Sequence, residues 1–194
     1  FRTTDGGATY AQVAKLTADD AASWDLFGGS VAIDGATIVV GAYYKSSGTG
    51  AVYVFRTTDG GATYAQVAKL TASDASSSDY LGRSVAVAGD TVVVGTSYKE
   101  SVYVFRTSDG GATYDQVAKL TASDAAADDR FGFSVATDGQ KVVVGAYQDD
   151  DGGSSSGSAY VYALPASSPA PTVAPTAWPL HAETDKMLAS DGAA

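Results

Sequence analysis

One stretch of sequence occurs three times in this chain, and that repetition constrains the fold more than any other feature. The string Phe-Arg-Thr-Thr-Asp-Gly-Gly-Ala-Thr-Tyr begins at Phe1 and returns nearly unchanged at Phe55 and Phe105. A period of about 50 residues is typical of solenoids, propellers and arrays, in which one supersecondary unit is stacked on its neighbours. We therefore predict that residues 1–163 are built from a single repeated unit.

Each unit has the pattern of four short β-strands. In the first complete unit these are Ser30–Ile33, Thr37–Ala42, Ala51–Phe55 and Ala65–Leu70. Asp34-Gly35, between the first two, is a strong signal for a two-residue hairpin because the turn needs a positive φ angle. No segment carries apolar residues at i, i+3, i+4 and i+7 over three turns, which excludes helical repeats.

The strands have the composition of sheets that are covered on both faces. Runs such as Ile38–Val40 and Val142–Val144 are apolar without polar alternates, unlike a strand with one face in water. Four-stranded antiparallel units of this size, packed face to face, are the blades of a β-propeller. We predict an all-β fold: a β-propeller fragment of about three four-stranded antiparallel blades in an open arc, followed by a disordered tail.

Counting the strands indicates an incomplete ring. Residues 11–17 match a fourth strand with no blade before it, and the last blade stops after its third strand at Ala159–Tyr162. Closed propellers have roughly four to eight blades, so we predict a segment of a longer propeller. Completion of the ring by self-association is the alternative, and in either case the terminal blades expose apolar faces.

The composition changes after Leu164. All 5 prolines of the chain lie beyond this residue, among Ala, Ser and Thr, which is typical of an extended linker or stalk. We assign residues 1–163 to the propeller blades and residues 164–194 to a linker or tail. Within the tail we expect at most a short helical turn around Glu183–Leu188.

Two motifs of the repeat resemble known families over roughly residues 1–163. Phe27-Gly28 with Gly41-Ala42-Tyr43, and Phe131-Gly132 with Gly145-Ala146-Tyr147, resemble the FG-GAP repeat of integrin α-subunit propellers, and Leu81-Gly82 with Gly95-Thr96-Ser97 is a degenerate copy. The Thr-x-Asp-x-Gly-x-Thr-Tyr strings that start at Thr3, Thr57 and Thr107 are similar to the Asp-box. In propellers that motif is a structural hairpin between the third and fourth strands of a blade.

The FG-GAP resemblance implies a binding or adhesion domain outside the cell or at its surface. In integrin-type blades an Asp-rich loop between the first and second strands holds calcium. That connection is a tight turn here, so Asp34, Asp90 and Asp138 do not match the ligand set. Asp149, Asp150 and Asp151 lie in a different loop without the alternate-residue spacing of a calcium loop, and they are weak candidates for a metal site.

Composition excludes several functional classes. The formal net charge is −10, and the chain lacks the clustered Lys and Arg that bind phosphate backbones, so no nucleic-acid partner is expected. The absence of Cys and the single histidine, His181, exclude a disulfide framework, a thiolate zinc site, a cysteine nucleophile and a multi-histidine metal site. No apolar run approaches the roughly 20 residues of a transmembrane helix, so this chain is not expected to span a membrane.

The variable loops indicate one rim of the arc as the functional face. The second-to-third and fourth-to-first connections share this rim, and the second-to-third loops differ in length between copies. Binding residues tend to lie on variable loops held by a rigid scaffold. The candidate ligand-binding residues on this rim are Tyr43, Tyr44, Tyr98, Tyr147, Asp25, Asp79 and Asp129.

More than half of the acidic residues fall on the same rim, which leaves three interpretations open. The first is a solvated acidic surface. The second is a bound hard cation such as calcium, although we expect no obligatory cofactor. The third is a basic or sugar ligand held by the tyrosines, and the expected partners are proteins or glycans.

We predict a non-enzymatic, extracellular or cell-surface scaffold for binding or adhesion. The near identity of the repeated strings favours a scaffold, because an active site needs different residues in different places. We interpret the recurring Asp5, Asp59 and Asp109 as turn residues, since Asp side chains in such turns bond nearby backbone N–H groups. The alternative is a propeller-type carbohydrate-active enzyme, a hydrolase or lyase, that uses carboxylates of the rim.

Overall fold

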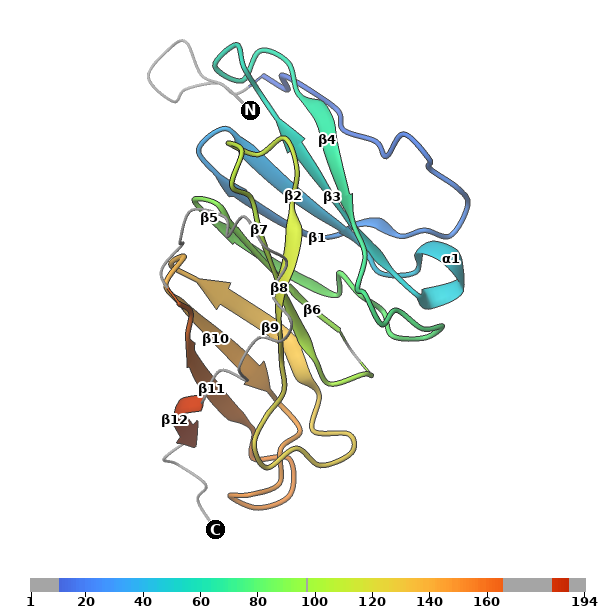
Figure 1. The fold of residues 1–194 in the computed structure, drawn as a ribbon. Coiled ribbons are helices and arrows are strands. Elements are labelled where there is room, and N and C mark those ends of the chain that lie inside the picture. The colour runs from blue at the N-terminus through green and yellow to red at the C-terminus, as the bar shows by residue number, and fades with distance from the viewer. Residues whose placement is uncertain (1–10, 97, 166–182, 189–194) are drawn as a thin grey trace.

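The computed structural model describes residues 11–96, 98–165 and 183–188, which form three antiparallel sheets lying one after another along an open arc (Figure 1). Each sheet has four strands, and the prediction of three four-stranded blades is confirmed. The first blade consists of β1 (Phe27–Asp34), β2 (Thr37–Ala42), β3 (Ala51–Arg56) and β4 (Ala65–Leu70). The second consists of β5 (Ser84–Ala88), β6 (Thr91–Gly95), β7 (Val102–Arg106) and β8 (Asp115–Leu120). The third consists of β9 (Phe131–Thr137), β10 (Lys141–Ala146), β11 (Ser158–Ala163) and β12 (Glu183–Leu188).

The repeated sequence produces a repeated strand register. β1 and β2 pair up to Asp34↔Thr37, and Gly35 in the turn between them has a φ of 52°. The pairing of the third and fourth strands contains a β-bulge at the same place in the first two blades, after Val54 and after Val104. The strand order and register of each blade therefore follow from its own short turns and local strand pairing, without contacts to a neighbouring blade.

The hydrophobic core lies between the blades. Because successive residues of a strand point to opposite faces, Val39 and Val54 of the first blade face the second, where they pack with Val94 and Tyr103. All four side chains have 0% exposure. The second and third blades pack through the equivalent residues. Each blade thus buries its apolar faces only against a neighbour, as in other repeat folds.

The glycines of the FG-GAP-like motif meet at the seam between blades. Gly82 has a φ of 88°, and a Cβ added to Gly41 would collide with the Gly82 carbonyl oxygen. Ser30 Oγ donates a hydrogen bond of 2.7 Å to that same oxygen. The seam between the second and third blades repeats this arrangement with Gly95, Gly132 and Ser84. The motif therefore recurs because only glycine permits this close approach of two backbones.

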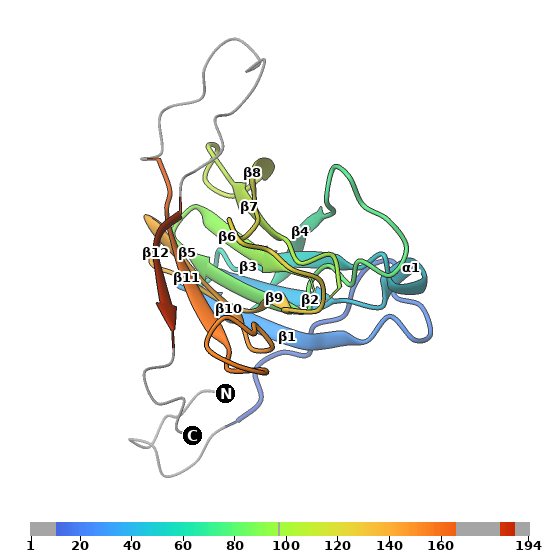
Figure 2. The same cartoon turned by 90° about the horizontal axis from the view of Figure 1, so that it is seen from below.

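The structure corrects the expected ends of the arc. Residues 11–17 form no strand, and Leu16 and Ala18 pack on the first blade instead. The third blade does not stop at three strands, since β12 pairs antiparallel with β11 at its edge (Figure 2). The helical turn expected around Glu183–Leu188 is therefore wrong. The other tail residues of that expectation, 166–182 and 189–194, lie outside the described residues.

β12 reproduces the register of a fourth strand although its sequence is unrelated to those of β4 and β8. Lys186 is the partner of Tyr160, as Lys69 is of Tyr53 and Lys119 of Tyr103. A register shift after Val161 matches the bulges of the first two blades. Without β12 the outer edge of β11 would lack a strand partner, and an extended segment that lies along this edge supplies the backbone hydrogen bonds whatever its side chains.

Both sheet faces are covered inside the arc, and the terminal blades expose apolar faces, as predicted. Val39 and Val93 are fully buried, whereas Val143, at the same position in the third blade, is 36% exposed. Val31 and Ile33 on β1 are each 66% exposed. The short element α1 (Lys45–Gly48) is a turn rather than a regular helix, because three of its four residues have positive φ. No helix among the described residues is long and apolar enough to cross a membrane.

Candidate functional site

The hairpins on one rim are structural, as the sequence predicts. Asp59 Oδ1 accepts hydrogen bonds of 2.9 Å from the backbone N–H groups of Ala62 and Thr63, and Thr57 Oγ1 accepts one of 2.8 Å from Gly61. The second blade repeats these bonds around Asp109. Asp5 lies outside the described residues. These carboxylates organise their own turns and do not converge on a common site.

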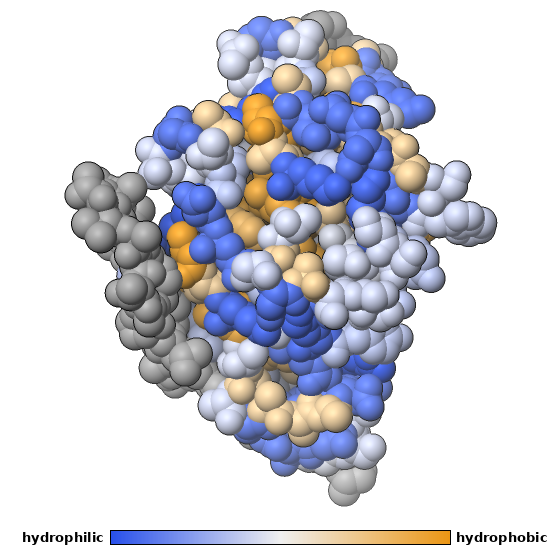
Figure 3. Space-filling model, turned by 45° about the vertical axis from the view of Figure 1, so that its right-hand side comes forward, coloured by the Kyte–Doolittle hydropathy of each residue, from blue (hydrophilic) through white to orange (hydrophobic). Residues whose placement is uncertain are grey.

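The opposite rim carries a groove of about 420 Å³ that draws side chains from all three blades. All four tyrosines proposed from the sequence line it. Its lining consists of Leu26, Tyr43, Tyr44, Tyr80, Arg83, Tyr98, Arg130, Phe133 and Tyr147. Figure 3 brings the right-hand side of Figure 1 toward the viewer and shows hydrophobic patches among hydrophilic side chains on that face of the molecule.

Sequence reasoning missed the groove residues that flank the Phe-Gly position. Leu26, Tyr80 and Arg130 precede the Phe-Gly or Leu-Gly pair in successive copies, and Arg83 and Phe133 follow it. The signal was present, because these positions differ between copies while the pair between them hardly changes. The preceding residue has positive φ in every copy, from 53° to 62°. That backbone conformation is uncommon for residues other than glycine.

The aromatic rings of the groove contact one another both within and between blades. Tyr80 lies 5.8 Å from Tyr44 and 5.2 Å from Tyr98, measured between ring centroids. Phe133 and Tyr147 lie 4.6 Å apart. Tyr44, Tyr98 and Tyr147 nevertheless remain 42%, 61% and 52% exposed, so their faces are accessible to a ligand.

Two arginines give the groove a positive character in an acidic chain. The Arg83 guanidinium lies 4.3 Å from the Phe133 ring, and that of Arg130 lies 4.3 Å from the Tyr98 ring. Arg130 also forms an ion pair of 3.2 Å with Asp128. Within the described residues, Arg83 makes ring contacts and no ion pair. Its N–H groups can therefore receive a carboxylate of a ligand.

The three acidic candidates do not line this groove. Asp25, Asp79 and Asp129 are each 8% exposed, and each accepts a backbone N–H bond within its own loop. Asp25 and Asp79 also form ion pairs of 2.8 Å with Lys45 and Lys99. The structure thus places them as anchors of the loops that carry the tyrosines.

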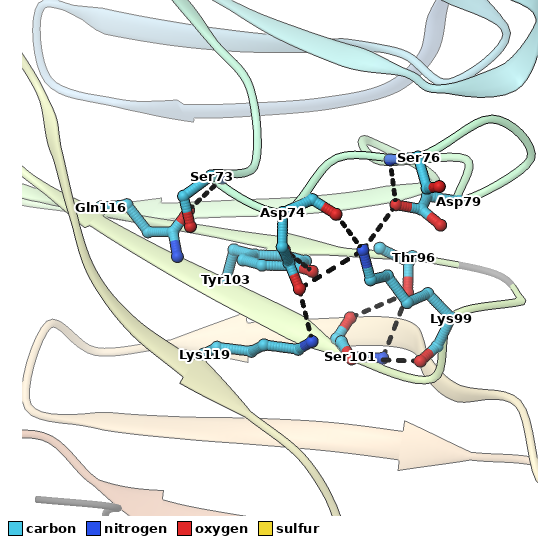
Figure 4. Close-up of polar contacts among 10 residues, drawn as sticks. All are labelled: Ser73, Asp74, Ser76, Asp79, Thr96, Lys99, Ser101, Tyr103, Gln116 and Lys119. Carbon is cyan, nitrogen blue, oxygen red and sulfur yellow. Dashed lines mark hydrogen bonds and ion pairs between the residues drawn. The ribbon is translucent and has the colours of Figure 1, made fainter.

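A network of charged residues supports those loops in the first two blades. Figure 4 shows the second copy, where Lys99 lies between Asp74 and Asp79, and Asp74 also contacts Tyr103 and Lys119. The first copy repeats it around Asp20. There, hydrogen bonds from Lys69 and Tyr53 hold the pKa of the Asp20 carboxyl well below its usual range.

The third blade departs from this network at one position. Alignment of the copies places Asp149 where the first two have Lys45 and Lys99. Asp149 is 2% exposed and accepts a hydrogen bond of 2.6 Å from Tyr160, whose hydroxyl also lies 3.0 Å from Asp124 Oδ1. A buried acidic residue therefore stands in the third blade where the first two blades have a lysine.

Two of the three weak metal candidates come together in this loop. Carboxylate oxygens of Asp124, Asp149 and Asp151 lie within 4.8 Å of one another, a set of ligand atoms that suits a hard cation such as calcium. Asp150 is not part of this set. Its carboxylate instead accepts a hydrogen bond of 2.6 Å from the Ser155 N–H.

Comparison with one solved structure supports the fold alone. The chain is similar to the structure titled "Crystal structure of the Saccharomyces cerevisiae Sqt1", with a TM-score of 0.52 and 10% sequence identity over 84% of this chain and 36% of that one. A "Europium-containing methanol dehydrogenase" gives a TM-score of 0.45 and 17% identity over 73% of this chain and 24% of that one. The chain thus spans about a third or less of these proteins.

Sequence comparisons identify the repeat. No curated protein sequence matches the chain. The family model described as "FG-GAP repeat" matches residues 10–55, 64–114 and 114–162, which is most of the chain and follows the three copies seen in the structure. The chain therefore belongs to the FG-GAP repeat family.

Proposed function

We propose that this chain is a non-enzymatic binding domain, extracellular or at the cell surface, that holds its ligand on the aromatic groove. FG-GAP repeats are typical of propeller-type domains that are often extracellular and serve binding or adhesion. The observation that carries the proposal is the convergence of Tyr43, Tyr44, Tyr98 and Tyr147, from three different blades, on one groove.

The chemistry of the groove favours a sugar ligand over a basic one. Exposed tyrosine rings offer flat apolar faces with a polar hydroxyl at the edge, which suits the mixed surface of a sugar ring. The buried acids Asp25 and Asp79 are already paired with lysines, so they offer little to a cationic ligand. Arg83 adds a site for a carboxylate, as in a uronic acid.

A glycan array that includes neutral and uronic-acid oligosaccharides tests this proposal. We expect binding to a subset of these glycans and a loss of at least about tenfold in affinity for Tyr98→Ala, because that ring is the most exposed in the groove. Arg83→Ala should weaken the acidic glycans more than the neutral ones. Titration calorimetry with the best glycan gives both values.

Trp24→Ala is the matched control, because Trp24 is 81% exposed and lies outside the groove lining. Its affinity should equal that of the parent protein. A Tyr98→Ala variant that binds as well as the parent would remove the groove from the proposal. Cleavage products from the bound glycan would instead favour the carbohydrate-active enzyme.

A further inference from the structure

The two ends of the arc carry opposite halves of an interface that occurs twice inside the chain. We call the side of each blade that carries Val39, Val93 or Val143 its forward face, and the side that carries Ile33 or Val87 its back face. Between the first two blades the forward Val39 and the back Val87 belong to one cluster. At the free ends, the forward Val143 is 36% exposed and the back Ile33 is 66% exposed.

The polar half-contacts at the ends are also complementary. Ser134 occupies the position from which Ser30 and Ser84 donate to the next blade's glycine carbonyl, and it is exposed. A Cβ added to Gly145 would meet only Ser134, its own blade's side chain, and one added to Gly28 would meet nothing within 4 Å. One end therefore presents a donor, and the other presents the glycine that accepts it.

The segment before the first blade contacts that blade in the way that the fourth strand of the first blade and the residues after it contact the second blade. Residues 11–17 are identical to residues 65–71. Leu16 and Ala18 pack on the first blade as Leu70 and Ala72 do on the second. Asp19 N–H donates to Gln66 Oε1 at 3.1 Å, and its counterpart Ser73 donates to Gln116 Oε1 at 2.9 Å. Among the described residues, positions 12–17 of this segment lack only a strand partner, and the outer edge of β11, where β12 pairs, has the matching register.

From these observations we propose that two copies of this chain associate head to tail into one closed ring of six blades. The forward face of each third blade packs on the back face of the other copy's first blade, and the Ser134 hydroxyl donates to the Gly28 carbonyl. Residues 11–17 pair with β11 of the other copy in the register of β4 and displace β12. Six blades lie within the roughly four to eight of closed propellers, and head-to-tail contacts form rings when the rotation closes.

Sedimentation equilibrium at micromolar concentration tests the ring. The chain has a mass of 19.6 kDa, and we expect a discrete species of twice that mass. Val143→Asp and Ile33→Asp should each give monomers, because every contact of the ring then contains one altered face. An equimolar mixture of the two variants should recover a dimer, since one of its two contacts is unaltered. A monomeric parent, or no recovery on mixing, overturns the proposal.

Val67→Asp is the matched control for these variants. Val67 is 37% exposed, close to Val143, but lies on β4 rather than on a free end. This variant should remain dimeric, and a monomer would show that the charge acts by general destabilisation. Circular dichroism of each variant confirms that the sheets are intact.

A cross-link tests the strand exchange separately. The register of β4 places Ala14 of one copy opposite Val161 of the other, as Ala68 lies opposite Val54. The chain has no native cysteine, so Ala14→Cys combined with Val161→Cys should give a covalent dimer under oxidising conditions. A protein that stays monomeric on a non-reducing gel overturns the exchange.

Discussion

The first two blades and the third blade use nearly the same residues in different surroundings. Val39 and Val93 are fully buried, and Val143 is 36% exposed. Lys45 and Lys99 tie their loops to buried aspartates, whereas Asp149 stands at this position in the third blade. The comparison shows that the repeated sequence specifies each sheet, and that the neighbouring blade determines whether its faces form a core.

The largest expected contrast is between two equivalent glycines. Gly95→Ala would drive a Cβ into the Gly132 carbonyl, a backbone atom that cannot move without opening the seam. We expect a loss of about 3 kcal/mol in the free energy of unfolding. Gly145→Ala meets only a rotatable serine side chain and should cost less than about 1 kcal/mol.

Urea denaturation in the Ile33→Asp background measures both glycine variants, because the forward face of the third blade then stays free. Equal losses for Gly95→Ala and Gly145→Ala would contradict the idea that close approach between blades, rather than strand geometry, requires glycine at this position.

The next contrast lies within the charged network of the first copy. Lys45 and Asp25 are a buried pair, with side chains 9% and 10% exposed. Lys45→Met leaves the Asp25 carboxylate buried without its cation and should cost about 2–3 kcal/mol. Lys69→Met removes a pair whose side chains are 35% and 46% exposed and should cost about 0.5 kcal/mol. A similar loss in both variants, measured by thermal unfolding, would refute this ranking.

Acid should weaken the features that distinguish the first two blades. Hydrogen bonds from Lys69 and Tyr53 lower the folded-state pKa of Asp20, and those from the Thr63 and Thr113 side chains and backbones lower the pKa of Asp59 and Asp109. Because these carboxyls have a pKa of about 3.9 when unfolded, their contribution is present above about pH 4 and is lost as pH falls through the lower folded pKa.

The melting temperature should therefore fall between pH 5 and pH 2.5. The fall should be smaller for the double variant Asp59→Asn, Asp109→Asn, since the hairpins then no longer titrate. If the melting temperature of this variant depended on pH as that of the parent does, the hairpin carboxylates would contribute nothing to the pH dependence of stability.

The smallest contrast concerns one hydroxyl group at each seam. Ser84 Oγ donates a hydrogen bond of 2.7 Å to Gly132, and its removal in Ser84→Ala should cost about 1 kcal/mol. Ser134→Ala should be near neutral in the Ile33→Asp background, where no second blade reaches this hydroxyl. If chemical denaturation showed a larger loss in the free energy of unfolding for Ser134→Ala than for Ser84→Ala, the assignment of Ser134 to the free face of the third blade would be wrong.

The part of the groove that sequence reasoning recovered is the part that recurs. Tyr43 and Tyr147 follow the Gly-Ala pair, and Tyr44 and Tyr98 occupy the next position of their copies, so these positions could be compared between copies. Tyr80, Arg83 and Arg130 differ from their counterparts, and nothing local shows that blade stacking brings them beside Tyr43 and Tyr98. Their role depends on contacts between residues that are distant along the chain.

The buried aspartates are residues that the sequence assigned to ligand binding and that the structure places outside the groove. Asp25 and Asp79 lie in acidic loops that the sequence assigns to a ligand-binding rim. The sequence alone gives no reason to pair them with lysines 20 residues away. The loops fold back so that Lys45 and Lys99 reach them. Burial of charge is decided by these long-range contacts, because an ion pair replaces the water that a surface carboxylate would keep.

The sequence by itself determined the four-stranded unit, its turns and its threefold repetition, because strand pairing and tight turns depend on residues close together in the chain. Only the tertiary structure decided that glycines meet at the seams, that the aromatic residues of three blades form one groove, and that β12 completes the last sheet. These features arise from packing and edge pairing between distant segments, which act on shape and unsatisfied backbone groups rather than on local sequence.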